Sequence, residues 1–432
     1  QMATVGANAP TDQPADRGNG YAVALAWTAL TPMPTAVALL LMNRASDWSQ
    51  FREAARLFTV PAQNLVYADR EGHIGYQAPG QVPVRGPGND GRMPAEGWLS
   101  SNDWTGEYVP FEALPSVLDP EEGFIVTANQ AVTGADYPYF LGADFDQGYR
   151  SQRIRDLIEA AGTVSPGDMS AIQADDRHPI AALLVPYLLD VELPAGYPSQ
   201  GQELLGQWDL RQSADSAAAA YFNIVWRHLL QRTFHDEVRE GARPTGSSRW
   251  VRVVSDILDD PTSPWWDDVE TPQMETRDDI LHESLLAARE DATTLMSRNP
   301  VHWSWGRLHQ LDLDHDVFGD VGVAPLEALF NSTGWATAGG SSTVDATAWD
   351  ATRGYAVTTA PSMRMVVSLA DFDDSRWLDL TGVSGHPMSR HYRDQTPRWA
   401  SGEPLAWPFS REAVQRAGTQ TLTLQPAAAQ TG

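Results

Sequence analysis

The chain has 432 residues, 42% of them hydrophobic, no cysteine and a formal net charge of −26. Its length and composition allow a large folded core, and the lack of cysteine excludes disulfides, thiolate zinc sites and a cysteine nucleophile. The negative charge argues against binding to nucleic acid or to anionic membranes, and no apolar run reaches the ~20 residues of a transmembrane helix.

The first elements are predicted from local patterns. Residues 1–20 are rich in Gly, Pro, Ala and Asp and are expected to form a mobile, exposed end. Residues 36–43 are apolar and are predicted to be helical. Residues 47–58 have helical spacing, with Asp47 or Ser46 as the expected N-cap. Residues 64–76 alternate around a turn, which predicts a β-hairpin.

A short β-branched run ends on a polar amide. Residues 123–128 predict a buried strand, and Asn129 follows at its end. An Asn side chain carries two N–H donors, and a donor held at the end of a rigid strand suits the stabilisation of a developing oxyanion. The alternative is an Asn that only satisfies local backbone groups, and composition alone favours this second interpretation.

The rest of the chain divides by pattern. Apolar residues at helical spacing predict helices over 153–161, 213–234, 247–258 and 276–296. We therefore expect a helical middle layer over about 150–300. Short runs between turn signals predict a strand-rich segment over 335–432, with a last strand at 421–424. This order of elements indicates an α+β fold with antiparallel strands.

Histidines and aspartates gather between residues 302 and 316. His302, His309 and His315 lie near Asp312, Asp314 and Asp316. The spacing of these histidines matches no compact zinc pattern. A metal hydrolase is kept only as a minor alternative, and His309 is instead expected to make a structural hydrogen bond beside Trp305.

Short motifs follow one another in a particular order along the chain. They are Asn64–Tyr76, Gly80–Arg85, Gly123–Asn129, Tyr149–Ile154, Trp303–His309, Gly339–Val344, Pro361–Arg364 and Gly382–Tyr392. In this order they resemble the penicillin acylase family of N-terminal-nucleophile amidohydrolases, over about residues 21–426. The resemblance implies the four-layer αββα architecture of these hydrolases. It also implies hydrolysis of a linear amide in an N-acylated compound, such as a β-lactam side chain, an acyl-homoserine lactone or a lipopeptide.

One feature departs from that family. There the nucleophile is the first residue of a mature chain, usually Ser, and its own α-amino group serves as the base. This chain begins with Gln1, which offers no such nucleophile. The resemblance thus implies that residues 21–432 correspond to the C-terminal part of an acylase large subunit. Such a part would be active only with a nucleophile-bearing segment and a small subunit of the same precursor, in an exported, soluble enzyme. The alternative is a non-catalytic binding or accessory protein that keeps the fold.

The resemblance also assigns roles to individual residues. It implies that Asn129 donates to the oxyanion and that Arg150 orients this corner of the site, the alternative for Arg150 being a salt bridge at a helix start. No cofactor is implied for catalysis. A structural calcium ion is implied, with Pro83 and Asp144 at the matching positions. Calcium takes six to eight oxygen ligands, more than we can assign, and Asp144 is alternatively an ordinary surface carboxylate.

Overall fold

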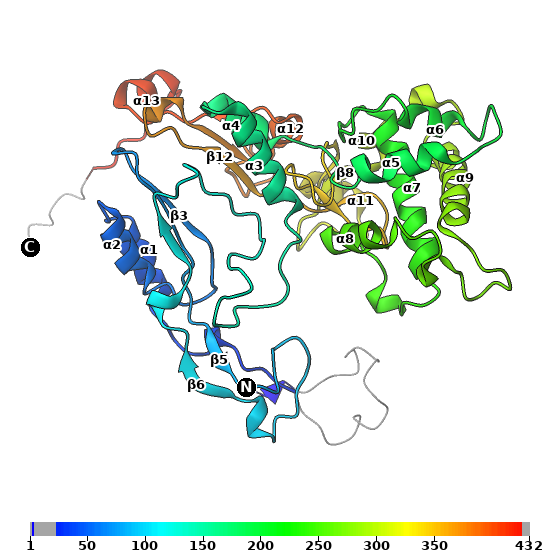
Figure 1. Ribbon diagram of the computed structural model, residues 1–432. Coiled ribbons are helices and arrows are strands. Elements are labelled where there is room, and N and C mark those ends of the chain that lie inside the picture. The colour runs from blue at the N-terminus through cyan, green and yellow to red at the C-terminus, as the bar shows by residue number, and fades with distance from the viewer. Residues whose placement is uncertain (1, 4–22, 426–432) are drawn as a thin grey trace, which may run out of the picture. The chain divides into compact units, whose positions relative to one another are not determined.

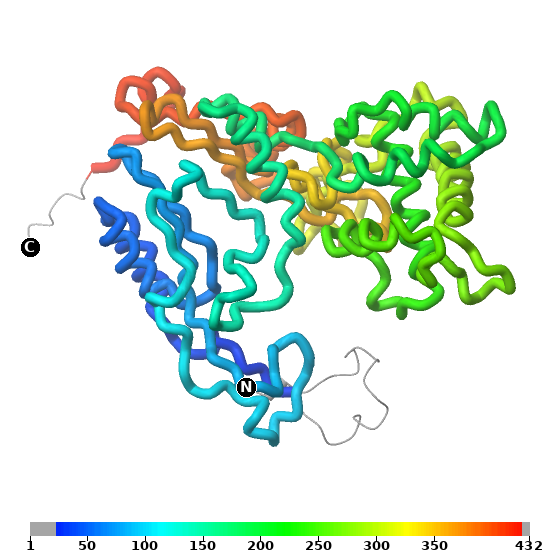
Figure 2. The backbone as a smooth tube through the Cα atoms, in the orientation of Figure 1, coloured from blue at the N-terminus to red at the C-terminus, as the bar shows by residue number. Residues whose placement is uncertain are grey.

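The computed structural model describes residues 2–3 and 23–425, and the chain divides into two compact units, residues 1–146 and 147–432 (Figures 1 and 2). The predicted boundary between residues 1–20 and the rest of the chain lies outside the described residues. In the part that is described, no helix is both long and apolar enough to cross a membrane.

The described part of the first unit contains two α-helices and several small antiparallel sheets. Its helices are α1 (Thr35–Met42) and α2 (Trp48–Ala55), and its strands are β1 (Met2–Ala3), β2 (Val23–Ala24), β3 (Leu65–Ala68), β4 (Ile74–Gln77), β5 (Pro83–Arg85), β6 (Trp104–Tyr108) and β7 (Ser116–Leu118). β3, β4 and β7 form one sheet, β5 pairs with β6, and β1 pairs with β2. The predicted hairpin over 64–76 is confirmed as β3 and β4.

Local signals explain where α2 begins and how it packs. The Asp47 carboxylate accepts a hydrogen bond from the Gln50 N–H at 2.8 Å, as an N-cap does. The Trp48 ring lies so close to β4 that a Cβ added at Gly75 would come within 2.6 Å of it. Both helices predicted in this region are therefore confirmed, although α2 ends earlier than expected, at Ala55.

Two predicted strands are wrong. Residues 124–127 are half-buried but belong to no sheet, and the backbone next pairs at an isolated bridge between Gln130 and Asp146. Residues 421–425 also form no strand, and Leu422 is 84% exposed. A β-branched run becomes a strand only where a neighbour completes its hydrogen-bond ladder, and among the described residues neither run is paired in such a ladder.

The second unit is built on a set of helices (Figure 1). They are α3 (Tyr149–Ala161), α4 (Pro166–Gln173), α5 (Ala181–Asp190), α6 (Gln200–Leu205), α7 (Ala217–Phe234), α8 (Ser248–Ile257), α9 (Arg277–Leu295), α10 (Trp305–Leu308), α11 (Ala324–Phe330), α12 (Thr396–Ser401) and α13 (Arg411–Ala417). The main core surrounds α7, which packs along α9 and buries Phe222 and Trp226 among others. A helix that is apolar on most sides is stable only when covered on those sides. The helices predicted over 153–161, 213–234, 247–258 and 276–296 are confirmed as α3, α7, α8 and α9.

The second unit also contains short antiparallel strand pairs. β8 (Gln310–Leu313) pairs with β9 (Ser332–Ala336), and β10 (Ala348–Trp349) pairs with β11 (Val357–Thr359). A three-stranded sheet has β13 (Arg376–Asp379) at its centre, between β12 (Met363–Val366) and β14 (Leu405–Ala406). A smaller core of Leu311, Leu378 and Trp399 joins two of these sheets to α12.

His309 lies fully buried at the C-terminal end of α10. Its ring stacks on Trp305 with the ring centres 4.5 Å apart. Its Nδ1 lies 2.8 Å from the Tyr355 carbonyl oxygen, and its Nε2 lies 3.1 Å from the Thr347 hydroxyl. Both ring nitrogens are thereby engaged, which confirms the predicted structural role beside Trp305 and leaves His309 no nitrogen for a metal.

Candidate active site

Asn129 lies in the first unit, on an exposed turn rather than at a strand end. Its φ of +67° is left-handed, a conformation that Asn adopts more readily than most residues. The Gln130 side chain clamps the turn, because its Oε1 accepts from the Ala128 N–H at 2.7 Å and its Nε2 donates to the Val126 carbonyl at 2.9 Å. The Asn129 carbonyl also accepts from the Asp146 N–H at 2.9 Å. The turn thus fixes the backbone that carries this amide.

Arg150 lies in the second unit, in the first turn of α3, and is half-buried. The helix starts after Gly148, whose φ of +88° suits glycine and which has no side chain to act as an N-cap. The first turn also contains no acidic residue. The partial positive charge of a helix N-terminus thus adds to the guanidinium charge. This arrangement favours a negative group near Arg150.

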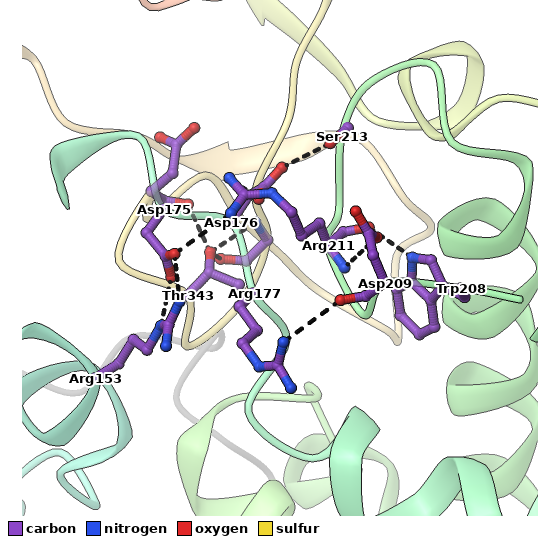
Figure 3. Close-up of polar contacts among 11 residues, drawn as sticks. Arg153, Asp175, Asp176, Arg177, Trp208, Asp209, Arg211, Ser213 and Thr343 are labelled. Carbon is purple, nitrogen blue, oxygen red and sulfur yellow. Dashed lines mark hydrogen bonds and ion pairs between the residues drawn. The ribbon is translucent and has the colours of Figure 1, made fainter. Parts of the chain in front are cut away.

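A buried carboxylate faces α3 from the segment after α4. Figure 3 shows Asp175 between Arg153 and Arg211. The Nε and Nη2 atoms of Arg153 donate to the two Asp175 oxygens at 2.9 and 2.8 Å, and the Asp175 side chain is only 5% exposed. Burial raises the pKa of Asp175, but the hydrogen bonds and charge of Arg153, aided by Arg211, outweigh burial and lower that pKa overall.

The adjacent carboxylate, Asp176, has its pKa shifted in the other direction. Arg211 lies 2.7 Å from Asp176, whose other oxygen accepts from the Ser213 hydroxyl at 3.1 Å (Figure 3). Burial is the largest influence on Asp176 and raises its pKa, because Arg211 and Ser213 offset only part of the desolvation. Two neighbouring acids in one buried network therefore have their pKa values shifted in opposite directions.

A cavity of about 210 Å³ lies against this network. The first two turns of α3, the segment at 177–179 and the loop at 342–344 line it; the side chains include Tyr149, Arg153, Arg177, His178 and Ser342. Burial lowers the pKa of His178 to about 3, so its ring is neutral. The loop is tied to the network because the Asp345 N–H donates to the Asp175 carbonyl at 2.9 Å.

Asp175 and Asp176 were not predicted as site residues from the sequence. The one sequence feature that could have indicated them is a pair of adjacent acids in a segment flanked by the apolar residues Ile172 and Ile180. Acids are almost never buried unless they are paired, so a buried pair there required arginines from elsewhere in the chain. Those arginines, Arg153 and Arg211, lie too far away in sequence to be recognised as partners from spacing.

The two predicted calcium ligands both lie in the first unit. Pro83 is half-buried at the start of β5, opposite Tyr108, and Asp144 is exposed. Among the described residues no group of three or more His, Asp or Glu side chains could hold a metal ion. One carboxylate and one carbonyl are fewer oxygens than calcium requires. These residues therefore do not make a calcium site by themselves.

Several known proteins are similar to this chain in sequence. The family model for penicillin amidase matches residues 8–416. A penicillin acylase 2 proenzyme from Pseudomonas sp. strain SE83 is 30% identical over 89% of this chain and 49% of its own length. An acyl-homoserine lactone acylase, QuiP, from Pseudomonas aeruginosa is 28% identical, also over 89% of this chain and 49% of its own length. This chain thus spans about half the length of these relatives.

A solved structure extends the comparison to the fold. The thermostable penicillin G acylase from Alcaligenes faecalis superposes with a TM-score of 0.60 at 18% identity, over 91% of this chain and 73% of that one. The similarity confirms the expected α+β fold of N-terminal-nucleophile hydrolases. Together with the match of the family model to residues 8–416, it shows that this chain belongs to the penicillin amidase family.

Proposed function

We propose that this chain takes part in hydrolysis of the linear amide bond of N-acylated compounds. The family match over residues 8–416 carries the proposal, and both relatives described above are acylases by name. The substrate class includes β-lactam side chains, acyl-homoserine lactones and lipopeptides. A Ser outside this chain, at the N-terminus of a nucleophile-bearing segment, attacks the amide carbonyl, and its α-amino group accepts the proton.

In this proposal Asn129 donates a hydrogen bond to the tetrahedral oxyanion. The support is its exposure on a turn that the Gln130 side chain holds by hydrogen bonds to the backbone of Ala128 and Val126. A donor fixed before the reaction needs no reorganisation when charge develops, and one such donor contributes about 2.7–4 kcal/mol to transition-state stabilisation. Arg150 supplies positive charge at the corner of the site, supported by its place at the N-terminal end of α3.

The proposed partners are the nucleophile-bearing segment and a small subunit of the same precursor. Support comes from an apolar surface in the first unit, the 23–41 surface, whose exposed side chains are Val23, Leu25, Trp27, Leu30, Val37, Leu39, Leu40 and Leu41. Leu40 is 65% exposed and α1 has no polar face. A helix that is apolar all round is normally covered on all sides, and exposed patches of this kind mark interaction sites.

Two further properties belong to the proposal. An exported location follows from the family resemblance. A structural calcium ion, bound with the help of Pro83 and Asp144, requires additional oxygen ligands from the proposed partners, because calcium takes six to eight oxygens. Measuring metal content in the assembled enzyme tests this point.

A co-purification experiment tests the function. The chain is isolated from its native source, every N-terminus in the sample is determined, and the sample is assayed with benzylpenicillin and with a long-chain acyl-homoserine lactone. We expect a second chain that begins with Ser and release of the free carboxylic acid. If Gln1 is the sole N-terminus and neither amide is cleaved, the non-catalytic binding protein becomes the better description.

A further inference from the structure

We propose that the ion pair between Arg153 and Asp175 positions Arg150 by holding the first turns of α3 in place. This inference rests on the proposed role of Arg150 in amide hydrolysis. It concerns a pair that touches no reacting atom, so Arg153 and Asp175 are positioning residues.

The geometry of α3 links the pair to Arg150. Residues three apart in a helix lie on the same face, so Arg150 and Arg153 occupy successive turns on one side of α3. Arg153 is anchored by two parallel hydrogen bonds, at 2.9 and 2.8 Å, to Asp175 (Figure 3). A bidentate pair of this kind fixes direction as well as distance. Movement of the first turn would break it.

The start of α3 carries no acid of its own. The N-cap residue Gly148 has no side chain to act as a cap and no acid lies in the first turn, while Arg150 and Arg153 place positive charge close to the positive end of the helix dipole. Asp175 supplies, from another segment, negative charge that the first turn of the helix does not carry.

Asp175 is itself held from two further sides. Arg211 lies 3.6 Å from its carboxylate, and its backbone carbonyl accepts from the Asp345 N–H at 2.9 Å. The next residue accepts through its carbonyl from the Gln212 N–H at 3.0 Å. The carboxylate that orients α3 is therefore tied to the 208–213 segment and to the 339–345 loop, and not to a single mobile side chain.

Packing does not replace the ion pair on this side of the helix. Tyr149, Gln152 and Arg153 line the 210 Å³ cavity, so the first turns of α3 have unfilled space beside them. Side chains that border a void lose contacts on that side. The ion pair thus supports these turns on a side that packing leaves open, and only its carboxylate, at 5% exposure, bears the full desolvation cost of burial.

The test is the Arg153→Lys variant, assayed on this chain together with the nucleophile-bearing segment. Lys keeps the positive charge but cannot form the two parallel hydrogen bonds. We expect kcat to fall roughly 10–100-fold, as a misplaced group causes, with KM changed by less than about twofold. Arg376→Lys is the matched control, because Arg376 also pairs with an aspartate and is 33% exposed against 32% for Arg153.

A double-mutant cycle separates positioning from a merely structural role. If Arg153 acts through Arg150, Arg153→Lys lowers kcat in the native background but has no further effect in an Arg150→Ala background. An equal loss in both backgrounds overturns the inference. A normal Arg153→Lys variant beside an impaired Arg150→Ala variant also overturns it and leaves the proposed function intact. A normal Arg150→Ala variant instead contradicts the proposed role of Arg150.

A measurement without substrate covers the case in which no amide is cleaved. Hydrogen exchange of the backbone amides that follow the first turn of α3 reports how often this part of the helix opens. We expect faster exchange in Arg153→Lys and in Asp175→Asn than in Arg376→Lys. Unchanged exchange in both variants of the pair overturns the claim that the pair holds the helix end, whatever the activity.

Discussion

The Asp345 carboxylate and the Arg364 guanidinium form an ion pair in which the side chains are only 9% and 10% exposed. Arg364 also donates to the Trp399 carbonyl at 3.0 Å, so the pair joins the 339–345 loop to β12 and α12. Because the backbone N–H of Asp345 binds the Asp175 carbonyl, this loop belongs to the same network as the start of α3.

This pair predicts a pH dependence of stability. Burial, the largest influence, raises the pKa of Asp345 from 3.8 to about 6, because Arg364 offsets only part of the desolvation. An acid with a raised pKa in the folded state contributes stability below its unfolded pKa and loses that contribution as the pH rises through the folded pKa. Relative to Asp345→Asn, the native chain should lose about 2–3 kcal/mol of unfolding free energy between about pH 4 and pH 6. Urea unfolding of both chains at several pH values measures the difference, and a constant difference would contradict the prediction.

The buried His309 side chain should make stability depend on pH in the opposite direction, with stability lost as the pH falls. Its burial lowers its pKa from 6.5 to about 4. Since protonation is disfavoured in the folded state, its contribution is fully present above pH 6.5 and is lost as the pH falls toward 4. Replacing His309 with Gln removes this acid-induced loss and, by disturbing two buried hydrogen bonds, lowers stability at pH 7 by about 1–3 kcal/mol. His386→Gln, at an exposed position, serves as the control, and thermal unfolding at pH 5 and pH 7 is the measurement.

Removing the Asn129 side chain should abolish most turnover without harming the fold. Because glycine adopts a positive φ at no steric cost, Asn129→Gly deletes the amide without straining the turn. We expect kcat to fall about 10²–10³-fold and the melting temperature to stay nearly constant, since the side chain is exposed. The control is Asn43→Ala, which removes another exposed Asn side chain, at the end of α1. Near-normal turnover in Asn129→Gly would show that Asn129 does not stabilise the oxyanion.

The Gln130 clamp should matter through Asn129. Gln130→Ala removes both side-chain hydrogen bonds that hold the turn, at 2.7 and 2.9 Å. A looser turn misplaces the donor, so we expect a smaller fall in kcat than in Asn129→Gly, roughly tenfold. Gln130→Glu keeps the acceptor for the Ala128 N–H and should recover part of the activity. A loss in Gln130→Ala that persists unchanged in the Asn129→Gly background would show that the clamp does not act through Asn129.

The 23–41 surface should be needed for assembly. Leu40→Lys places a charge where α1 is expected to meet the nucleophile-bearing segment or the small subunit, and desolvating that charge opposes association. We expect a weaker complex by analytical ultracentrifugation, by roughly tenfold or more in Kd. Val301→Lys, at an 82% exposed position in the second unit, is the matched control. Equal affinity of both variants for the partner would place the interface elsewhere.

The sequence alone determined the features that depend on neighbouring residues. The N-cap Asp47 marks the start of α2 and acts within four residues of its own backbone. The hairpin over 64–76 is likewise a local structure. The order of short motifs was enough to indicate the family, and with it Asn129 and Arg150 as candidate site residues.

The tertiary structure decided what depends on distant partners. Residues 124–127 have strand-forming side chains, yet a strand exists only where another completes its ladder, and so Asn129 lies on a turn instead. The burial of Asp175 is tolerable only because Arg153 and Arg211 converge on it from other segments. Neither fact can be read from spacing, because ladder pairing and charge compensation are set by which surfaces the folded chain brings together.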